Sequence, residues 1–230
     1  MEKELIGIID LLTSNELGTI SEGLNRLHKL LHSLLPSIKQ YLMSTSSLPV
    51  PSNLVQFETL QNNFQYNLTQ YLIPIYAYDM GVEQYLMCNK LLQGLLLVHP
   101  ASRRIFNLAR NMKVLVDLLE SDLDIELTIS LISTLIHVLL KDFENYRVFE
   151  KLGGCSVLIR HFKLSSFERI RDGEEEFNNN LNFKIIEFLM LYLLDEPKGG
   201  KSIAEKSQFF VKDFPEIDSL IDNLSQLYNL

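Results

Sequence analysis

The hydrophobic residues of this chain recur at intervals of three and four positions, and they do not alternate with polar residues. Two stretches show this clearly: Leu24, Leu27, Leu30, Leu31, Leu34 and Leu35 in one, and Leu91, Leu92, Leu95 and Leu96 in the other. This spacing places the apolar side chains along one face of a helix. Signals that end helices agree with it, because Pro36 and residues 44–53 interrupt one helical stretch and His99-Pro100 ends another. The pattern predicts an all-α fold.

The chain also resembles itself at a fixed offset. The segment RIFNLARNMKVLVDLLE, which begins at Arg104, aligns without a gap on RVFEKLGGCSVLIRHFK, which begins at Arg147, an offset of 43 residues. The same offset places Leu92 on Leu135, Leu96 on Leu139, Phe106 on Phe149, Val114 on Val157 and Leu115 on Leu158. A period of this size is typical of HEAT and armadillo arrays, in which each helical unit buries its apolar face against the next. We therefore expect residues 1–230 to form a single armadillo/HEAT-like helical domain.

Two segments interrupt the expected array. Residues 44–53, STSSLPVPSN, predict a loop, whose hydroxyl side chains at 44–47 are candidates for phosphorylation. Residues 167–180, FERIRDGEEEFNNN, form an acidic, asparagine-rich insert that reads as a solvated loop or as a docking element. A third repeat is expected to begin near residue 182. An amphipathic segment at 216–230 is a candidate cap for one end of the array, and an uncapped end is a candidate surface for self-association.

Charge and hydropathy narrow the classes of function. The 21 basic residues are outnumbered by 29 acidic ones, and the net charge of −8 opposes the attraction to phosphate on which nucleic-acid binders rely. The opening MEKELIGIIDLL lacks the basic start of a secretory signal, and apolar runs such as LLQGLLLV are too short to span a bilayer. We expect a cytoplasmic protein that binds no nucleic acid and does not insert into membranes.

One cysteine lies in a segment with a superficial likeness to a phosphatase loop. In GGCSVLIR, four residues separate Cys155 from Arg160, whereas a cysteine-dependent phosphatase needs five between its nucleophile and its arginine. The repeat alignment places Cys155 on Met112, which favours a buried apolar role, and residues 153–154 read as a turn between two helices. Cys88 lies in a similar apolar stretch. We expect both thiols to be reduced and buried.

A second pattern with candidate chemistry is HKLLH, in which His28 and His32 lie one helical turn apart. Two imidazoles at this spacing can share a zinc ion. Lys29 stands where a metalloprotease would carry its glutamate, and no neighbouring cluster supplies a third ligand. No glycine-rich phosphate loop and no kinase or hydrolase signature occurs in the sequence. The sequence therefore predicts no enzyme activity, no metal and no cofactor.

Exposed residues on the aligned helices are candidates for binding a partner. On the helix over 112–120 we expect Val114, Leu115, Leu118 and Leu119 to be buried. The candidate strip of outward residues consists of Lys113, Asp117, Ser156, Arg160 and Lys163. This mixed-charge strip either pairs with a segment of a partner or is an ordinary solvated face. Arg103, Arg104 and Arg147 precede the short helices, where a guanidinium group either joins neighbouring repeats or meets an acidic or phosphorylated partner.

Particular segments resemble a known family. They are FETLQNNFQYNLTQYLIP at 57–74, LLQGLLLVHPASRRIFNLARNMKVLVDLLE at 91–120, NYRVFEKLGGCSVLIRHFK at 145–163 and KIIEFLMLYLLDE at 184–196. They resemble the fungal cell division control protein 14 family, a component of the septation initiation network, and LQGLLLVHPASRR is the most specific part. This family is unrelated to the dual-specificity phosphatase of similar name, whose signature the chain does not carry.

The resemblance implies a noncatalytic scaffold or regulatory subunit. Such a subunit associates with a germinal-centre-class protein kinase, is recruited from the cytoplasm to the spindle pole body, and promotes septum formation and cytokinesis. The alternative is a general armadillo-like adaptor with a different protein cargo, because a fold does not determine its partner.

Overall fold

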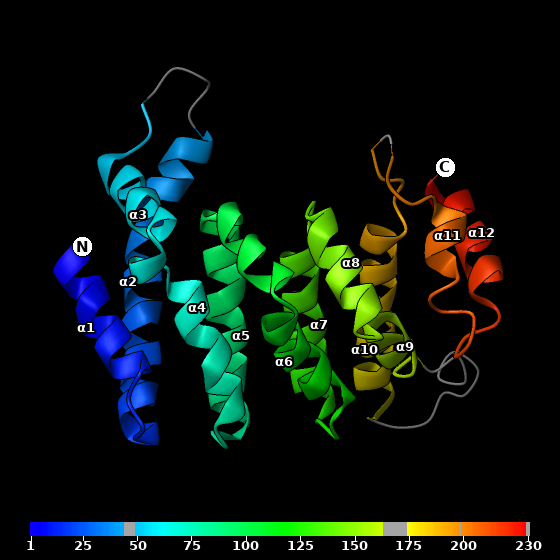
Figure 1. Ribbon diagram of the computed structural model, residues 1–230, viewed down its shortest axis with the longest axis horizontal. Helices are drawn as coiled ribbons and strands as arrows, with labels where there is room; N and C mark the ends of the chain where they lie inside the picture. The colour runs from blue at the N-terminus through cyan, green and yellow to red at the C-terminus, as the bar shows by residue number, and fades with distance from the viewer. Residues whose placement is uncertain (44–48, 163–173, 198, 229–230) are drawn as a thin grey trace. The chain divides into compact units, whose positions relative to one another are not determined.

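The regular structure of this chain, in the part that the computed structural model describes, is entirely helical (Figure 1). The described residues are 1–43, 49–162, 174–197 and 199–228, with the backbone alone for 174–179 and 224–228. The α-helices are α1 Glu2–Leu12, α2 Leu17–Met43, α3 Ser52–Asn62, α4 Leu68–Leu72, α5 Gly81–Val98, α6 Ala109–Glu120, α7 Ile125–Leu139, α8 Phe143–Lys151, α9 Gly154–Ile159, α10 Glu174–Tyr192, α11 Ile203–Ser207 and α12 Ile217–Tyr228. The 3-10 helices are η1 Phe64–Tyr66, η2 Ile73–Ala77 and η3 Pro100–Asn107. The prediction of an all-α fold is confirmed.

The chain divides into two compact units, residues 1–105 and residues 106–230. The first contains α1 to α5 and the second contains α6 to α12. The expectation of a single domain stays a prediction.

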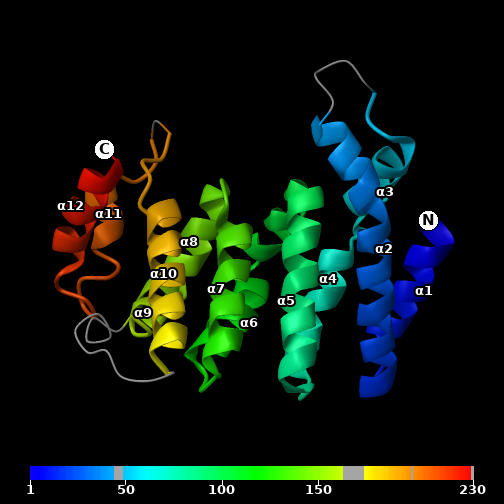
Figure 2. The same ribbon diagram turned by 180° about the vertical axis from the view of Figure 1, so that it is seen from behind.

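In the first unit, α2 lies between α1 and α5 and packs against both (Figures 1 and 2). Its core-facing side chains are Ile20, Leu24, Leu27, Leu30 and Leu34, all fully or almost fully buried. The expected interruption at Pro36 is wrong, because α2 continues through it to Met43. A proline removes one helical hydrogen bond. Helix α2 packs against both α3 and α5, and directly after the proline Asn53 donates a hydrogen bond of 2.8 Å to the hydroxyl of Ser37.

A buried polar network ties the end of α3 to η3 within the first unit. Asn67 donates to the carbonyl of Gln61 and to the hydroxyl of Ser102, at 2.8 and 2.9 Å. One ring nitrogen of His99 lies 2.7 Å from the same hydroxyl, and the other lies 3.0 Å from the Asn62 side-chain oxygen. Burial lowers the pKa of His99 from its ordinary value of 6.5, so the neutral imidazole is the form that this network favours.

Burial along α5 repeats along α7 at the offset of 43 residues. The buried positions of α5 are Cys88, Asn89, Leu91, Leu92, Leu95 and Leu96, and those of α7 include Leu131, Ile132, Thr134, Leu135, Val138 and Leu139. Each residue of the first set corresponds to one of the second. The shorter helices follow the same rule, because Met112 and Leu115 of α6 and their counterparts Cys155 and Leu158 of α9 are all buried. The two segments therefore present equivalent faces to the core.

In the second unit, α7 packs against α10, and α6 packs against α8 and α9 (Figure 2). Leu115 and Leu119 of α6 are buried as expected, whereas Val114 and Leu118 are only partly buried, and Met112 and Val116 fill the core in their place. Gly153 has the left-handed backbone conformation, with φ of 74°, and caps the start of α9. The predicted turn between α8 and α9 is confirmed.

Both loops were predicted to extend further along the chain than they can, because a helix begins inside each predicted range. Helix α3 begins at Ser52, inside the loop expected over 44–53, and α10 begins at Glu174, inside the acidic insert expected over 167–180. Acidic residues at the start of a helix interact favourably with its dipole, so the Glu-rich part of the insert suits a helix N-terminus. Residues 44–48, with the candidate phosphorylation sites, and residues 163–173 lie outside the described part of the chain.

Candidate functional site

Arg147 is the member of the predicted arginine group that the structure places most firmly. It extends from α8 to the carboxylate of Glu196, which follows α10, and it also lies 3.1 Å from Glu150. Both carboxylates are almost completely buried. Arg147 therefore joins two helical segments of the same unit, which is one of the two roles that the sequence left open for it.

The charges around Arg147 form a closed cluster. Lys201 donates to Glu150, and Lys206 lies 3.1 Å from Glu196. Glu150 also accepts a hydrogen bond of 2.7 Å from the hydroxyl of Tyr192. Because each buried carboxylate has at least two cationic partners, the cluster is a structural ion network and not a vacant anion or metal site.

The two remaining arginines of that group have different surroundings. Arg103 is partly buried and donates to the carbonyl of Leu96 at 3.2 Å, within the same unit. Arg104 is exposed and makes no ion pair with the described part of the chain. Of the three, Arg104 retains an exposed charge for a partner.

Lys113, Asp117 and Arg160 of the predicted mixed-charge strip are exposed, as expected, whereas Ser156 is partly buried, and all four have partners within the chain. Lys113 lies 2.5 Å from Asp117, one turn along α6. Arg160 lies 2.9 Å from Glu120, and the hydroxyl of Ser156 donates to Asp213. Exposed pairs of this kind contribute little stability and separate easily, so the strip remains a candidate surface without a distinctive shape. Lys163 lies outside the described residues.

Cys155 lacks the surroundings of a nucleophile. It is 1% exposed at the start of α9, and burial raises the pKa of its thiol to about 12. A reactive cysteine needs the opposite, a partly exposed thiol with a lowered pKa. Arg160 is engaged with Glu120. Cys88 is likewise buried with a pKa raised to about 12 by burial, so the prediction that both cysteines lie in the core is confirmed.

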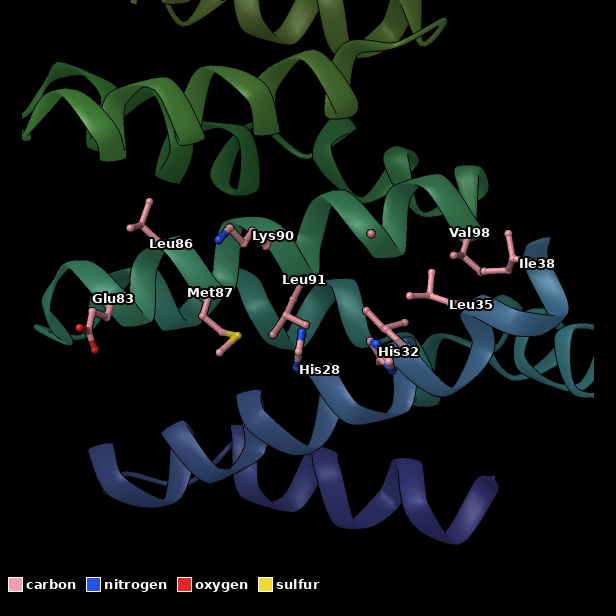
Figure 3. Close-up of a pocket in the computed structure, with 12 residues that line it drawn as sticks. His28, His32, Leu35, Ile38, Glu83, Leu86, Met87, Lys90, Leu91 and Val98 are labelled. Atoms are coloured by element: carbon pink, nitrogen blue, oxygen red, sulfur yellow. The ribbon is translucent and has the colours of Figure 1, made fainter. Parts of the chain in front are cut away.

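A groove that the sequence did not reveal lies between α2 and α5 in the first unit (Figure 3). It has a volume of about 500 Å³. The α2–α5 groove is lined by Leu31, Leu35 and Ile38 from α2, by Leu86, Met87, Leu91, Gly94 and Val98 from α5, and by the polar residues His28, His32, Glu83 and Lys90. Most of its wall is apolar, and its polar groups lie on both helices. This combination is typical of a surface that accepts a peptide or another helix.

The two ends of the α2–α5 groove differ in character. Near the C-terminal end of α5, Val98 faces Leu35 and Ile38 across the groove, whereas Glu83 and Lys90 lie toward the other end (Figure 3). Leu35 is 41% exposed although it sits in the middle of a packed helix. At the C-terminal end of α2, Leu42 and Met43 are 76% and 81% exposed. The apolar surface of α2 therefore continues past the core that the first unit buries.

His28 and His32 lie on this groove with their rings 6.3 Å apart between centroids. Within the described residues, no group of three or more His, Cys, Asp or Glu side chains is placed to hold a metal ion. The two imidazoles are therefore best understood as part of the polar edge of the groove. Nor is any helix in the described part of the chain both long and apolar enough to cross a membrane.

A shallower hollow lies between α7 and α10 in the second unit. It is lined by Glu126, Ile129, Asn180, Phe183, Lys184 and Glu187. Glu126 and Ile129 lie 43 residues after Glu83 and Leu86 of the α2–α5 groove. The repeat thus places equivalent residues of α5 and α7 at the edge of a groove in each unit. The sequence alignment had predicted such an equivalence only for buried positions.

Comparison with known proteins gives two findings. The family model described as "Cell division control protein 14, SIN component" matches residues 1–200. A curated relative, Cell division control protein 14 of Schizosaccharomyces pombe (strain 972 / ATCC 24843), is 24% identical over 141 residues, which cover 59% of this chain and 55% of that protein. The matched region thus spans little more than half of the relative's length. No solved structure matches.

Proposed function

The chain belongs to the cell division control protein 14 family, a component of the septation initiation network in cell division control, and on this premise we propose a regulatory function. In our proposal it is a noncatalytic scaffold subunit that binds a germinal-centre-class protein kinase and thereby promotes septum formation and cytokinesis. It acts in the cytoplasm and is recruited to the spindle pole body. The observation that carries the proposal is the family match over residues 1–200.

The proposal includes an armadillo/HEAT-like array. The array is supported by the burial pattern, because each buried position of α5 corresponds to a buried position of α7 at the offset of 43 residues. Met112 and Cys155, which correspond at the same offset, are both buried as well. A repeat that buries equivalent positions presents equivalent exposed positions as well. Such an array binds a partner over an extended surface and needs no deep pocket.

A noncatalytic role is supported by what surrounds the candidate reactive groups. The Cys155 thiol is buried and its pKa is raised, and the carboxylates of Glu150 and Glu196 are neutralised by Arg147 and two lysines. The α2–α5 groove of the first unit is instead apolar, with a few polar groups at its edges. These features fit binding of a protein better than chemistry on a small molecule.

The direct test is co-purification. The full chain should elute as a stoichiometric complex with a germinal-centre-class kinase of the same cell, and kinase assays with and without the subunit then separate activation from localisation. If clean, monodisperse protein binds no kinase of this class, the proposed function is overturned, and an adaptor with a different cargo takes its place.

A further inference from the structure

We propose that the α2–α5 groove is the docking surface for the partner, and that its occupant is an acidic amphipathic helix of the kinase. This inference rests on the proposed function, since it names the surface and the chemistry through which the kinase would be held. Three features of the groove carry it: its length, its floor and the charge along its edges.

The length of the groove fits a short helix. Its lining on α5 runs from Glu83 to Val98, and at 1.5 Å per residue this distance is about 22 Å, or about four helical turns. The α2 side supplies apolar groups at Leu31, Leu35 and Ile38, spaced by one turn each. An amphipathic helix of three to four turns would place its apolar side chains against them at i, i+3 or i+4, and i+7.

The floor of the groove is kept low by a glycine that the fold does not require. Gly94 lies in the interior of α5, where glycine is less stable than alanine by about 0.5–1 kcal/mol. A Cβ atom at this position would meet only the Leu31 side chain, at an ordinary contact distance of 3.6 Å. An alanine would therefore fit here, and its methyl group would occupy space beside Leu31 in the groove that the glycine leaves open.

The charge at the edges favours an acidic occupant. Between Glu22 and Glu58 the sequence contains Arg26, Lys29 and Lys39 but no acidic residue, so α2 beyond Glu22 carries no group that would repel an acidic occupant. On α5, Lys90 is exposed, lines the groove and forms no ion pair with the described residues. Glu83 is the one acidic side chain that lines the groove. In a chain with a net charge of −8, three basic residues without an acidic one between positions 22 and 58 are a local reversal of sign.

The shape of the surface argues against a second copy of this chain as the occupant. A symmetric dimer brings the same surface of both copies together. Two concave grooves placed face to face do not fill one another, whereas one amphipathic helix fills one groove. A partner helix with acidic side chains also complements the basic residues of α2.

The first experiment maps the occupant directly. A photo-crosslinking amino acid replaces Leu35 in the full chain, and in a control protein it replaces Phe64, which is 70% exposed on η1 and outside the groove. Each protein is mixed with the purified kinase, complex formation is measured by gel filtration, and crosslinked peptides are identified by mass spectrometry. We expect crosslinks from position 35, and not from position 64, to an acidic amphipathic segment of the kinase.

Substitutions then test the three features without disturbing the fold. Lys90→Glu and Leu35→Ala should each weaken kinase binding about tenfold. Gly94→Ala should weaken it by about threefold to tenfold while leaving the protein at least as resistant to urea as the wild type. Matched controls are Lys3→Glu, an exposed lysine of α1, Leu97→Ala, which is 58% exposed on α5 but outside the groove, and Gly7→Ala in α1, where a Cβ meets nothing within 4 Å. The controls should bind the kinase as the wild type does.

The possible results separate the two proposals. If the wild-type complex forms but position 35 does not crosslink and the groove variants bind normally, the groove inference is wrong and the proposed function stands. Crosslinks from position 35 to a second copy of this chain, or to a basic segment of the kinase, would also overturn the inference. If no complex with the kinase forms at all, the proposed function fails and the inference fails with it.

Discussion

Lys206 offers the sharpest test of the ion network in the second unit. Its side chain is 0% exposed, and its ammonium group donates to the carbonyl oxygens of Tyr192 and Leu194, at 2.9 and 2.5 Å, and lies 3.1 Å from Glu196. The first of these carbonyls belongs to the last turn of α10, where helical carbonyls have no partner within the helix. We predict that Lys206→Met, which keeps most of the length of the side chain and removes its charge, destabilises the protein substantially.

The magnitude follows from what is lost and what remains. Two carbonyl groups lose a charged donor, and each hydrogen bond to a charged group contributes about 1.5–3 kcal/mol. Glu196 is not left unpaired, because Arg147 and the backbone amide of Lys201 still contact it. Methionine also avoids the cost of burying an ammonium group, which offsets part of the loss. We expect a net decrease of about 2–4 kcal/mol in the free energy of unfolding.

Urea denaturation followed by far-ultraviolet circular dichroism measures this change, since the chain contains no tryptophan to report on unfolding. The matched control is Lys184→Met, which removes a lysine whose partner Glu187 is 56% exposed and should cost about 0.5 kcal/mol or less. If Lys206→Met shifts stability by less than about 1 kcal/mol, or by no more than the control, then the network does not hold the segment after α10 in place.

Three further predictions concern buried groups elsewhere. Because burial raises the pKa of Cys88 and Cys155 to about 12, neither thiol should react with a disulfide reagent at pH 8 until the protein is unfolded, and fast labelling of the native protein would contradict their placement in the core. Gly154→Ala should destabilise the protein by about 1–3 kcal/mol in urea denaturation. Its Cβ would lie 2.3 Å from the ring of Phe149, and a variant as stable as the wild type would show that the ring moves aside freely. Burial holds the pKa of His99 in the folded protein below the ordinary 6.5, so its contribution to stability is present above that pH and is lost as the pH falls through the lower folded value. The melting temperature should therefore decline below about pH 6.5 in the wild type, and His99→Asn should reduce that decline; an unchanged slope would refute the assignment.

Periodicity predicted the class of the fold and much of its core, because burial is what imposes the three-and-four spacing. The offset of 43 residues anticipated that Leu92 and Leu135, or Phe106 and Phe149, occupy equivalent buried positions, and all four are fully buried. Helix ends were harder to predict. The spacing of apolar residues predicts that a helix ends at a proline or an acidic stretch. The chain nevertheless remains helical where tertiary contacts or a favourable helix dipole compensate for the low helix propensity of these residues.

For the candidate binding residues, the sequence predicted exposure but not the partners of the exposed charges. Exposure of Lys113 and Asp117 follows from their place on α6, but the sequence does not say that an exposed charge already has a partner. Asp117 forms an ion pair with Lys113, one turn away on the same helix. Arg160 forms an ion pair with Glu120, which lies 40 positions earlier in the sequence. Arg147 was recognised as an arginine that either joins helices or meets a partner, and only the buried position of Glu150 and Glu196 decides between these roles.

The α2–α5 groove escaped prediction because its residues belong to a pattern that reads as ordinary core. Six leucines of α2 share the helical spacing, yet only Leu24, Leu27, Leu30 and Leu34 of the six are buried in the interior of the first unit. Leu31 is partly buried and Leu35 is exposed. An apolar stripe that is wider than the neighbouring helices cover indicates a binding surface. It can be recognised once the buried residues of the helix are distinguished from the exposed ones. Gly94 gives the same signal from the opposite helix, since a glycine in a helix interior with room for a methyl group has no explanation within the unit. Two departures from what stability alone would select therefore meet in one place, and this coincidence is the reason to seek the partner there.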